Sequence, residues 1–566
     1  VTCNFSSNLG VGYVNENDAC LPGALPVFYT QLQEAWISVG MININASGTV
    51  TRYGNICGST AAYCLVADGI NLGIVDHDNF DVLNGNAIDT GNSGSSYAAP
   101  QISGMIALLA EAFPNHTPAQ LTDRLLASAN NSFFSVTAYT NFANGTRHGY
   151  DTTYGHGIPD IYGALSPINT GTYSVSQMLT GGTILSSRSQ SDGGAYGINS
   201  SQFIQSQSLG DSLSAALQGT SAYFYDGLDG GFKFNFSNLF SLNNANLSLL
   251  STLSSDISRL KHFNKLETKK YNYSFSNILG SIGSKDSNLL SINIDTPSKP
   301  IQYFNQLNTG QDFYLTSFNN PFTDNKKGGL GISNEFKVGD KDILIGYHDT
   351  EQRSGLFGET EFKAKTLAMT VSQSNELFDN FTLLSGLMIE QDTLLDSKGS
   401  GALGFHDTNP HSLFAGVNLE KVIGDDLSIK FVSTIGYSTV DTPSNSLIGE
   451  VTDITSASFN FIANKYNIFN DNDRLAISIG QPNRVESGSM VVRLPGLAAA
   501  TGEIPYENVI VDLTPSGRQI DIGIDYVVEL DNDLILGFKN TISKDFNHIN
   551  DAQLNNTFTF TATLDF

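Results

Sequence analysis

The chain has 566 residues, and 55 acidic side chains against 29 lysines and arginines give it a formal net charge of −26 at pH 7. A chain of this length exceeds one ordinary hydrophobic core and predicts two or three domains, while its acidic balance argues against nucleic-acid binding, which needs a basic face for the phosphates. The sequence holds no run of about 18 apolar residues, which excludes a membrane-spanning helix but leaves a membrane β-barrel open.

The chain begins at Val1 without an initiator methionine or a basic, apolar signal segment, and we interpret it as a mature form or a fragment. All four cysteines lie in the first 64 residues, which favours an oxidising compartment over four unpaired thiols. Four cysteines can form two disulfides in three different ways. Cys57 and Cys64 would close a short loop, which is worth about 2–3 kcal/mol in the chain-entropy model, and Cys3 with Cys20 would be the remaining pair.

Residues 1–166 carry the signals of an α/β domain. Ile37 to Ile44 is a largely apolar strand, Ala61 to Val66 leads to a second strand, and Ala98 to Ala112 is apolar enough for a buried helix. Another helix is predicted to start at Thr117-Pro118-Ala119-Gln120, which supplies an N-cap, a proline at the first helical position and a glutamine that completes a capping box.

A turn of small residues precedes the longer helix and places Ser96 at its start. Free backbone N–H groups and the positive end of the helix dipole can stabilise an alkoxide or an oxyanion there, as an acyl-transfer nucleophile requires. A plain loop before a core helix would have the same composition. The segment reads Gly94-Ser95-Ser96-Tyr97-Ala98-Ala99-Pro100.

This segment resembles the Gly-Thr-Ser-x-Ala-Ala-Pro nucleophile motif of subtilisin-like serine proteases, with Ser95 in place of the threonine. The resemblance extends over roughly residues 13–166 and implies that Ser96 is the catalytic nucleophile. Three other segments resemble parts of the same family. Trp36 to Gly40 resembles a core strand, and Tyr154 to Asp160 resembles the Gly-x-Gly segment that closes the protease domain. Tyr53 to Gly58 with Tyr63 to Ala67 resembles the cysteine-paired segment found in autotransporter members.

A subtilisin-type site also needs a histidine base, an aspartate that holds its tautomer and an asparagine at the oxyanion hole. In the family the aspartate and histidine precede the serine by well over a hundred residues, but only 95 residues precede Ser96, and none of the nine histidines lies in a His-Gly-Thr-His segment. We therefore expect both groups upstream of Val1 and little peptidase activity in the chain as given. The resemblance assigns the oxyanion asparagine to Asn15, with Asn17 as the alternative.

Other polar residues of this region have structural interpretations. His77 lies between Asp76 and Asp78 in an acidic stretch that we interpret as a surface loop, and His156 lies within the domain-closing Gly-x-Gly. Asp76, Asp78 and Asp81 could bind calcium, but they lack a defined loop geometry, so we interpret them as a solvated turn and expect no cofactor.

Residues 167–310 change to a Ser-, Gly-, Asn- and Thr-rich composition, and we predict a β-rich linker or passenger region of unassigned fold. Residues 167–219 are predicted to be a linker with one weak helical piece at Ser208 to Leu217. Aromatic residues then alternate with polar ones, as in half-buried strands. They are Phe232, Phe234 and Phe236, and Tyr271, Tyr273 and Phe275.

Residues 311–566 are predicted to form twelve antiparallel strands, joined by tight turns and long loops in alternation. Period-2 alternation with short turns and longer loops is typical of an outer-membrane β-barrel, whereas a soluble β-sandwich or solenoid has no reason to alternate its connections. The turns are at Gly339 to Asp342, Leu377 to Asn380, Gly424 to Asp426, Asn470 to Asp473 and Asp531 to Asp533. The loops span 321–328, 349–361, 396–410, 441–456, 495–517 and 547–555.

The last strand shows the expected two faces. Phe558, Phe560 and Phe566 lie on one face, and Thr559 and Thr561 lie on the other. We assign the first face to lipid and the second to the lumen, because a membrane barrel is apolar outside and polar inside.

Three late segments resemble barrel strands of subtilisin-type autotransporters, and the chain ends on an aromatic residue as the family does. They are Gln481 to Gly488, Val491 to Pro495 and Asp512 to Arg518. The resemblance implies a surface-displayed or secreted serine endopeptidase exported by type V secretion. The implied partners are polypeptide substrates, the outer membrane of a Gram-negative bacterium and its barrel assembly machinery. The alternatives are a non-catalytic adhesin passenger on a degenerate protease fold and a soluble protease with a β-rich tail.

Overall fold

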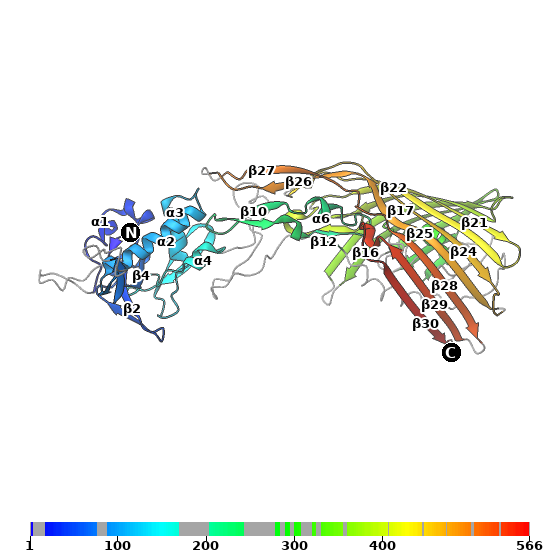
Figure 1. The fold of residues 1–566 in the computed structure, drawn as a ribbon. Coiled ribbons are helices and arrows are strands. Elements are labelled where there is room, and N and C mark those ends of the chain that lie inside the picture. Colours follow the sequence, from blue (N-terminus) through cyan, green and yellow to red (C-terminus); the bar gives the residue numbers. More distant parts are fainter. Residues whose placement is uncertain are drawn as a thin grey trace, which may run out of the picture. The chain divides into compact units, whose positions relative to one another are not determined.

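The computed structural model divides the chain into two compact units, each described by itself below (Figure 1). The first unit comprises Val1–Ser200, Ala222–Phe234 and Pro495–Glu507, and the second comprises Ser201–Ser221, Asn235–Leu494 and Asn508–Phe566. The structure describes residues 2–3, 17–75, 88–168, 203–242, 278–282, 289–294, 299–306, 320–323, 330–354, 359–405, 407–443, 446–470, 472–499, 503–530 and 534–564.

A small sheet organises the first unit. Its central strand β2 (Ser38–Ile44) pairs in parallel with β4 (Cys64–Asp68), from Ser38 opposite Cys64 to Ile42 opposite Asp68. β1 (Thr2–Cys3) pairs in parallel with the start of β2, and β3 (Val50–Tyr53) pairs antiparallel with its end. The predicted strand at 37–44 is confirmed as β2, and the predicted second strand is β4, which follows the 3-10 helix η2 (Gly58–Tyr63). Most residues of the two strands are buried, as parallel strands require.

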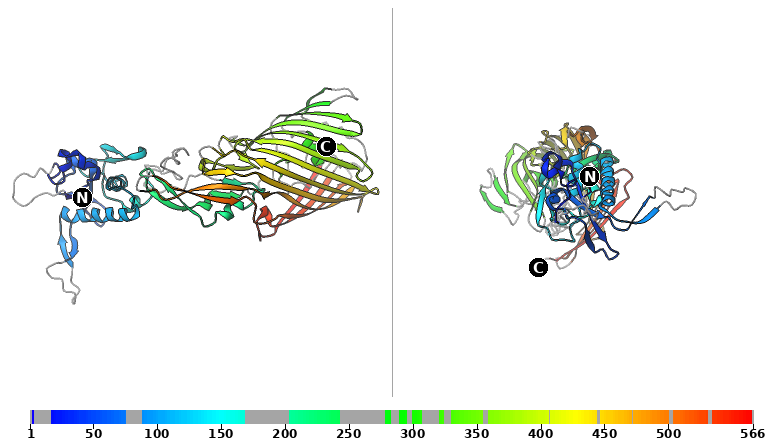
Figure 2. Two further views of the ribbon diagram at one scale, coloured as in Figure 1. Left: turned by 90° about the horizontal axis from the view of Figure 1, so that it is seen from above. Right: turned by 90° about the vertical axis from the view of Figure 1, so that its left-hand side faces the viewer.

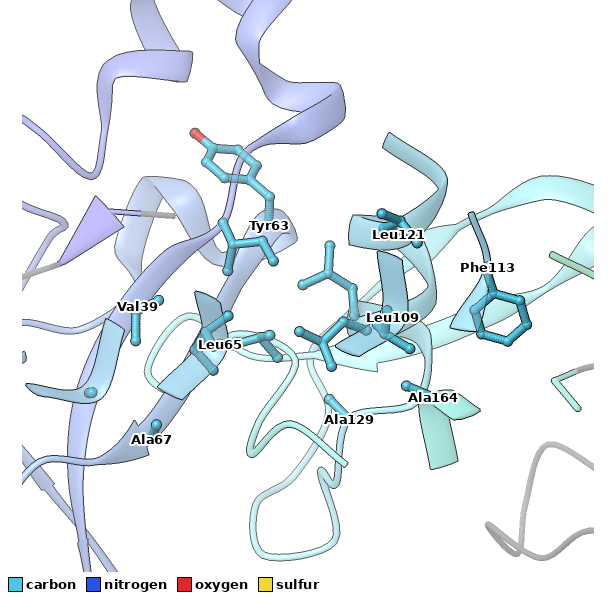
Figure 3. Close-up of a cluster of buried hydrophobic side chains, with 14 residues drawn as sticks. Val39, Tyr63, Leu65, Ala67, Leu109, Phe113, Leu121, Ala129 and Ala164 are labelled. Carbon is cyan, nitrogen blue, oxygen red and sulfur yellow. The ribbon is translucent and has the colours of Figure 1, made fainter. Parts of the chain in front are cut away.

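Helices pack against this sheet and form the core of the unit. α2 (Ser95–Ala112) and α3 (Pro118–Ala127) bury Ile102, Leu109 and Leu125 completely. Figure 3 shows strand residues Val39 and Leu65 facing helix residues such as Leu109 across this cluster.

The predicted capping box at the start of α3 is confirmed. The Gln120 backbone N–H donates to Thr117 Oγ1 over 3.3 Å, and the Thr117 N–H donates to Gln120 Oε1 over 2.9 Å. The remaining elements of this unit are α1 (Leu25–Phe28), η1 (Thr30–Ala35), η2 (Gly58–Tyr63), β5 (Leu72–Val75), β6 (Ile88–Asn92), β7 (Ala138–Asn141), η3 (Ala143–Gly145), β8 (Arg147–Tyr150) and α4 (Ile161–Leu165), together with most of the hairpin β10 (Ser221–Tyr225) and β11 (Gly231–Asn235).

A disulfide joins Cys57 to Cys64, with a Cα–Cα distance of 5.9 Å, which confirms the predicted short loop. The sulfur of Cys20 lies near Gly23 and Ser38, and the backbone of Cys3 pairs with Val39, the next residue along β2. The Cys3–Cys20 pairing stays a prediction.

The second unit is dominated by one antiparallel sheet, which has thirteen strands in the part of the chain that the structure describes. Its order is β13-β14-β15-β16-β17-β18-β21-β22-β24-β25-β28-β29-β30, and it curves as a barrel wall does (Figures 1 and 2). The strands are β13 (Ile278–Ile282), β14 (Leu289–Ile294), β15 (Leu330–Val338), β16 (Lys341–Ser354), β17 (Glu359–Gln373), β18 (Asn380–Glu390), β21 (His411–Ile423), β22 (Leu427–Thr439), β24 (Ile454–Tyr466), β25 (Asp473–Ser487), β28 (Ile520–Leu530), β29 (Leu534–Lys544) and β30 (Asn555–Leu564).

This sheet differs from the predicted twelve strands in three respects. Eleven of its described strands lie within 311–566, and the first predicted strand, before the loop at 321–328, falls almost wholly outside the described residues. β13 and β14 precede residue 311, and they are short strands in a Ser- and Asn-rich stretch where period-2 alternation is weak. β16 and β17 continue through most of the predicted loop at 349–361. The tight turns at 339–342, 377–380, 424–426 and 470–473 are confirmed, and the turn at 531–533 lies outside the described residues.

The two faces of the sheet differ as predicted. Phe558 and Phe560 are about 60% exposed, at 59% and 61%, whereas Thr561 on the opposite face is buried. The same contrast holds on β28, where Ile522 and Ile524 are exposed and Asp525 is buried. The register of the last strand is therefore confirmed, and its assignment to lipid stays a prediction.

A segment between β14 and β15 lies against the polar face of the sheet. The helix α8 (Lys299–Gln306) places Phe304 over Gly416, where an added Cβ would lie 2.6 Å from the phenyl ring. Farther along, Asn320 Nδ2 donates to Thr434 Oγ1 and Ser458 Oγ over 2.6 and 3.0 Å. The missing glycine side chain and the paired polar groups thus hold this segment in place.

Part of the predicted linker at 167–219 is folded and buried. β9 (Phe203–Gln205) pairs with β12 (Phe240–Leu242) and with β20 (Ser397–Gly399), and its Phe203 is fully buried. The weak helical piece is present as the shorter α6 (Ser212–Ala216). Buried hydroxyl and amide groups, such as Ser397 Oγ accepting from the Ser206 N–H, make this Ser-rich stretch a packed structure. The other short elements of the unit are η4 (Phe236–Leu239), β19 (Thr393–Leu394), η8 (Gly401–Leu403), β23 (Ile448–Val451), β26 (Ser489–Pro495), β27 (Tyr506–Asp512) and η9 (Phe546–His548).

Among the described residues, no helix is long and apolar enough to cross a membrane.

Candidate functional site

Ser96 occupies the second position of α2, directly after the buried Ser95, and its side chain is exposed. The helix starts where the parallel pair β2 and β4 ends, because the Gly94 N–H donates to the Gly69 carbonyl over 2.8 Å and the Gly69 N–H donates to the Ile42 carbonyl over 3.0 Å. The carboxyl ends of parallel strands are where α/β folds place their reactive groups. Ser96 therefore lies at the start of a helix as predicted, but the helix is amphipathic and not buried: only Ser95, Ala98, Ile102 and Leu109 are buried, and Leu108 on its other face is exposed.

Small residues are required for this junction. An added Cβ on Gly69 would lie 2.9 Å from the Gly94 carbonyl oxygen and 2.7 Å from the Met41 side chain. Gln101 fixes the same junction from the helix, since its Nε2 donates to the Asp68 carbonyl over 2.7 Å. The strand end and the helix start are thus held together on both sides of the turn that precedes Ser96.

The chemistry available at Ser96 follows from the helix start. The first N–H groups of α2 have no partner within the helix, and the 18-residue helix adds its positive dipole end at the same place. Both features stabilise negative charge on a serine oxygen or on a carbonyl that it attacks. The helix start can therefore stabilise negative charge beside Ser96.

Two described histidines of the first unit, His148 and His156, contact each other and backbone carbonyls. His148 Nδ1 and His156 Nδ1 lie 2.8 Å apart, His148 Nε2 lies 2.9 Å from the Ala129 carbonyl, and His156 Nε2 lies 3.0 Å from the Ala62 carbonyl. Burial lowers the pKa of both histidines, that of His156 to about 3, so the pair is neutral at pH 7. A structural role for His156 therefore agrees with its surroundings.

Several predicted residues lie outside the described residues. They are Asn15, His77, Asp76, Asp78 and Asp81. In the part of the chain that the structure describes, no three His, Cys, Asp or Glu side chains are grouped as a metal site would need. The oxyanion asparagine and the calcium alternative are thus untested predictions.

The sequence analysis missed a buried ion pair in the first unit. The Arg124 guanidinium and the Asp226 carboxylate are both 0% exposed and are joined by two hydrogen bonds of 3.1 and 2.6 Å. Arg124 also donates to the carbonyls of Ala164 and Ser166, and its guanidinium lies 4.2 Å from the centre of the Phe113 ring. The only sequence signal is that Arg124 shares the apolar face of α3 with Leu121 and Leu125.

Asp226 is also what makes the β10–β11 hairpin part of the first unit. Its carboxylate accepts from the N–H groups of Ile168, Leu228 and Gly230 at 2.8 to 3.0 Å. Every lone-pair direction of this buried carboxylate thus has a donor, as burial of a charge requires. Most of the hairpin therefore belongs to the first unit, beyond the predicted boundary at residue 166.

Comparison with known proteins identifies the family of one region. Residues 15–157 match the model of the subtilase family, Peptidase S8. A search of curated proteins gives no match.

Among solved structures, similar ones include MycP1 from the ESX-1 type VII secretion system (20% identity, 29% of this chain, TM-score 0.20) and the prenylagaramide maturation protease PagA (22% identity, 23% of this chain, TM-score 0.16). The chain covers 41% of the length of each. The β domain of the Bordetella autotransporter BrkA is also similar, with 11% identity over 41% of this chain and 87% of that one, at a TM-score of 0.19.

Proposed function

We propose that residues 1–166 are part of a subtilisin-type serine endopeptidase in which Ser96 is the nucleophile. The observation that carries this proposal is the exposed Ser96 in the first turn of α2, at the carboxyl end of β4, within the segment that matches the subtilase family. In the reaction, Ser96 Oγ attacks the carbonyl of a polypeptide substrate, and the helix start stabilises the resulting oxyanion. Asn15 is the proposed side-chain donor to the same oxyanion.

The second unit is proposed to be the outer-membrane barrel of an autotransporter. Its antiparallel sheet exposes large apolar side chains such as Ile435 and Phe560 on one face and buries polar ones such as Asn418 on the other. That distribution is inverted relative to a soluble protein and suits a wall between lipid and a polar lumen. The barrel would be inserted by the outer-membrane assembly machinery and would display the protease unit at the cell surface or release it.

Labelling with a fluorophosphonate probe tests the nucleophile. The chain is expected to react slowly, because His148 and His156 are engaged with each other and with backbone carbonyls, and a triad that lacks a base retains only roughly 10³- to 10⁴-fold catalysis over water. The measurement is repeated on a form that includes any residues its gene encodes before Val1. That form is expected to hydrolyse peptides, and Ser96→Ala is expected to abolish both labelling and hydrolysis.

The matched control is Ser103→Ala, an exposed serine on the same helix whose Oγ donates only to the Ala99 carbonyl. This variant is expected to behave as the unmodified chain. Labelling that survives Ser96→Ala would reject Ser96 as the nucleophile. Rapid labelling of the printed chain would show that its base lies within these 566 residues.

A second candidate is a non-catalytic adhesin passenger on the same fold. It is favoured by the engagement of His148 and His156 with each other and with backbone carbonyls, which leaves neither as a base for Ser96. Peptide hydrolysis that depends on Ser96 in any natural form of the protein would exclude this candidate.

A further inference from the structure

The β10–β11 hairpin lies mostly in the first unit, although the chain leaves that unit on both sides of it. Residues Ala222–Phe234 belong to the first unit, whereas Ser201–Ser221 and Asn235–Leu494 belong to the second. The hairpin is therefore tied by peptide bonds to the second unit at both ends, while its contacts described below are with residues 1–168 of the first unit. The peptide chain and these contacts are thus two separate links between residues 1–168 and the rest of the protein.

A fully buried ion pair fixes how the hairpin is seated. The Arg124 guanidinium of α3 and the Asp226 carboxylate of the hairpin are 0% exposed and share two hydrogen bonds. Gly230 closes over this pair, because an added Cβ there would lie 2.5 Å from Arg124 Nη1. Any other seating leaves a buried charge without its partner, so the pair makes the contact specific.

Apolar side chains supply the attraction at the same contact. The Phe232 ring of β11 lies 5.7 Å from the Phe113 ring, centre to centre, and packs against the core cluster of Figure 3. Leu228 in the hairpin turn is 3% exposed. Burial of apolar area is the dominant favourable term when protein surfaces associate. The contact thus resembles a domain core cut in two, as lasting protein interfaces do.

Hydrogen bonds from three separate parts of residues 1–168 hold the rim of the hairpin. The Gly227 N–H donates to the Ile168 carbonyl over 2.8 Å, and Asn144 Nδ2 donates to the Gly227 carbonyl over 3.2 Å. His116 Nε2 lies 3.0 Å from the Asp229 carbonyl oxygen. The hairpin is thus bound by the loop before α3, by η3 and by the segment after α4.

We propose that this hairpin is a non-covalent clamp that keeps residues 1–168 bound to the rest of the protein after the chain is cut between residues 169 and 202. Such a cut hydrolyses a peptide bond and leaves the Arg124–Asp226 pair and the Phe113–Phe232 contact in place. Proteolysis ahead of the hairpin therefore does not by itself release residues 1–168. With the second unit as the membrane anchor, a step that rests on the proposed function, these residues then stay at the cell surface.

The test cuts the full chain in detergent at a recognition sequence for a specific protease, which is inserted with Gly-Ser spacers between residues 169 and 202. An affinity tag ahead of Val1 captures the N-terminal fragment, and a denaturing gel shows when cutting is complete. The C-terminal fragment is expected to be captured with it through washing and gel filtration, and to separate only in denaturant. Its loss under native conditions would overturn the proposal. This readout needs neither peptidase activity nor a membrane, so failure of the proposed function would leave it unaffected.

Variants then locate the clamp. Asp226→Asn is expected to speed release of the cut fragment by roughly tenfold or more, because it leaves the buried Arg124 cation without its partner. Lys233→Gln, at an exposed position of the same hairpin, is the matched control and is expected to change nothing. Asn115→Ala removes the hydrogen bond to the Ala498 carbonyl, outside the hairpin, and is also expected to change nothing. Release in Asn115→Ala, or unchanged retention in a folded Asp226→Asn variant, would reject the hairpin as the clamp. If Asp226→Asn does not fold, the cut of the chain without substitutions decides.

Discussion

The two units bury polar groups in opposite ways. In the first unit the Arg124–Asp226 pair is enclosed by an apolar cluster, and backbone donors and acceptors complete its hydrogen bonds. In the second unit one whole face of the sheet is polar and buried, including Lys430 and Glu420, while large apolar side chains are exposed on the other face. A buried polar side chain is therefore an exception inside the first unit and common on one face of the sheet in the second, so a new charge is expected to have different consequences in the two.

The largest expected effect comes from breaking the ion pair of the first unit. Arg124→Met leaves the Asp226 carboxylate buried without its cation, which costs about 3–5 kcal/mol. Trp36, the single tryptophan of the chain, reports on this unit, because its Nε1 donates to the Gly23 carbonyl over 3.2 Å. Urea unfolding followed by Trp36 fluorescence measures the loss.

Arg147→Met is the matched control for this prediction. The exposed Arg147 guanidinium lies 3.6 Å from the centre of the Tyr139 ring, and such an exposed contact is worth about 0.5–1 kcal/mol. Similar losses in the two variants would contradict the view that burial sets the importance of the Arg124 pair.

The converse experiment places a charge on each face of β30. Phe560→Arg is expected to cost about 2–4 kcal/mol if the exposed face meets lipid near the bilayer midplane. Thr561→Arg is expected to cost far less, because Thr561 lies on the polar face opposite Gly537, which offers no competing side chain. Heat-modifiable migration in gels and urea stability in lipid measure both. Equal tolerance would reject the lipid assignment, and a chain soluble without detergent would reject the barrel.

The disulfide of the first unit gives a smaller expected effect. Replacing Cys57 and Cys64 together by serine is expected to lower the free energy of unfolding by about 2–3 kcal/mol, since the short loop regains its freedom in the unfolded chain. Trp36 fluorescence in urea measures the change, and non-reducing peptide mapping should recover the linked pair. Two free thiols in protein from an oxidising compartment would contradict the prediction.

The sequence predicted the features whose signals lie in neighbouring residues, and it missed most of those that depend on residues far apart in the chain. Local signals sufficed for the capping box at Thr117 and for the register of β30, because helix starts and period-2 faces are written in adjacent residues. The turn at Ser96 needed a family motif, since small residues before a helix are common. The strands β13 and β14 were missed because short strands in a Ser-rich stretch carry little alternation.

The long-range features had no local signal. Arg124 finds Asp226 across 102 residues, and Tyr225 finds Gly496 across 271, so neither contact could be placed from spacing. The assignment of Asn15 stays a prediction from resemblance, because that residue lies outside the described part of the chain.

The last prediction concerns the pH dependence of the first unit. Burial lowers the pKa of His156 from 6.5 to about 3, so the folded unit takes up less proton than the unfolded chain as the pH falls. The stability that this histidine contributes is present above about pH 6.5 and is lost progressively below it, by roughly 2 kcal/mol at pH 5. Asp123 acts in the opposite direction, because burial raises its pKa to about 6.

Because these two groups oppose each other, the sensitive measurement is a difference between variants. The free energy of unfolding, followed by Trp36 fluorescence, is compared at pH 7.5 and pH 5 for the unmodified chain and for His156→Asn. Between pH 7.5 and pH 5, the free energy of unfolding of His156→Asn is expected to fall by roughly 2 kcal/mol less than that of the unmodified chain. This difference does not depend on how much stability the variant loses at pH 7.5. Identical pH dependence in the two proteins would mean that His156 shares a proton with His148, whose Nδ1 lies 2.8 Å away, and titrates near its ordinary value.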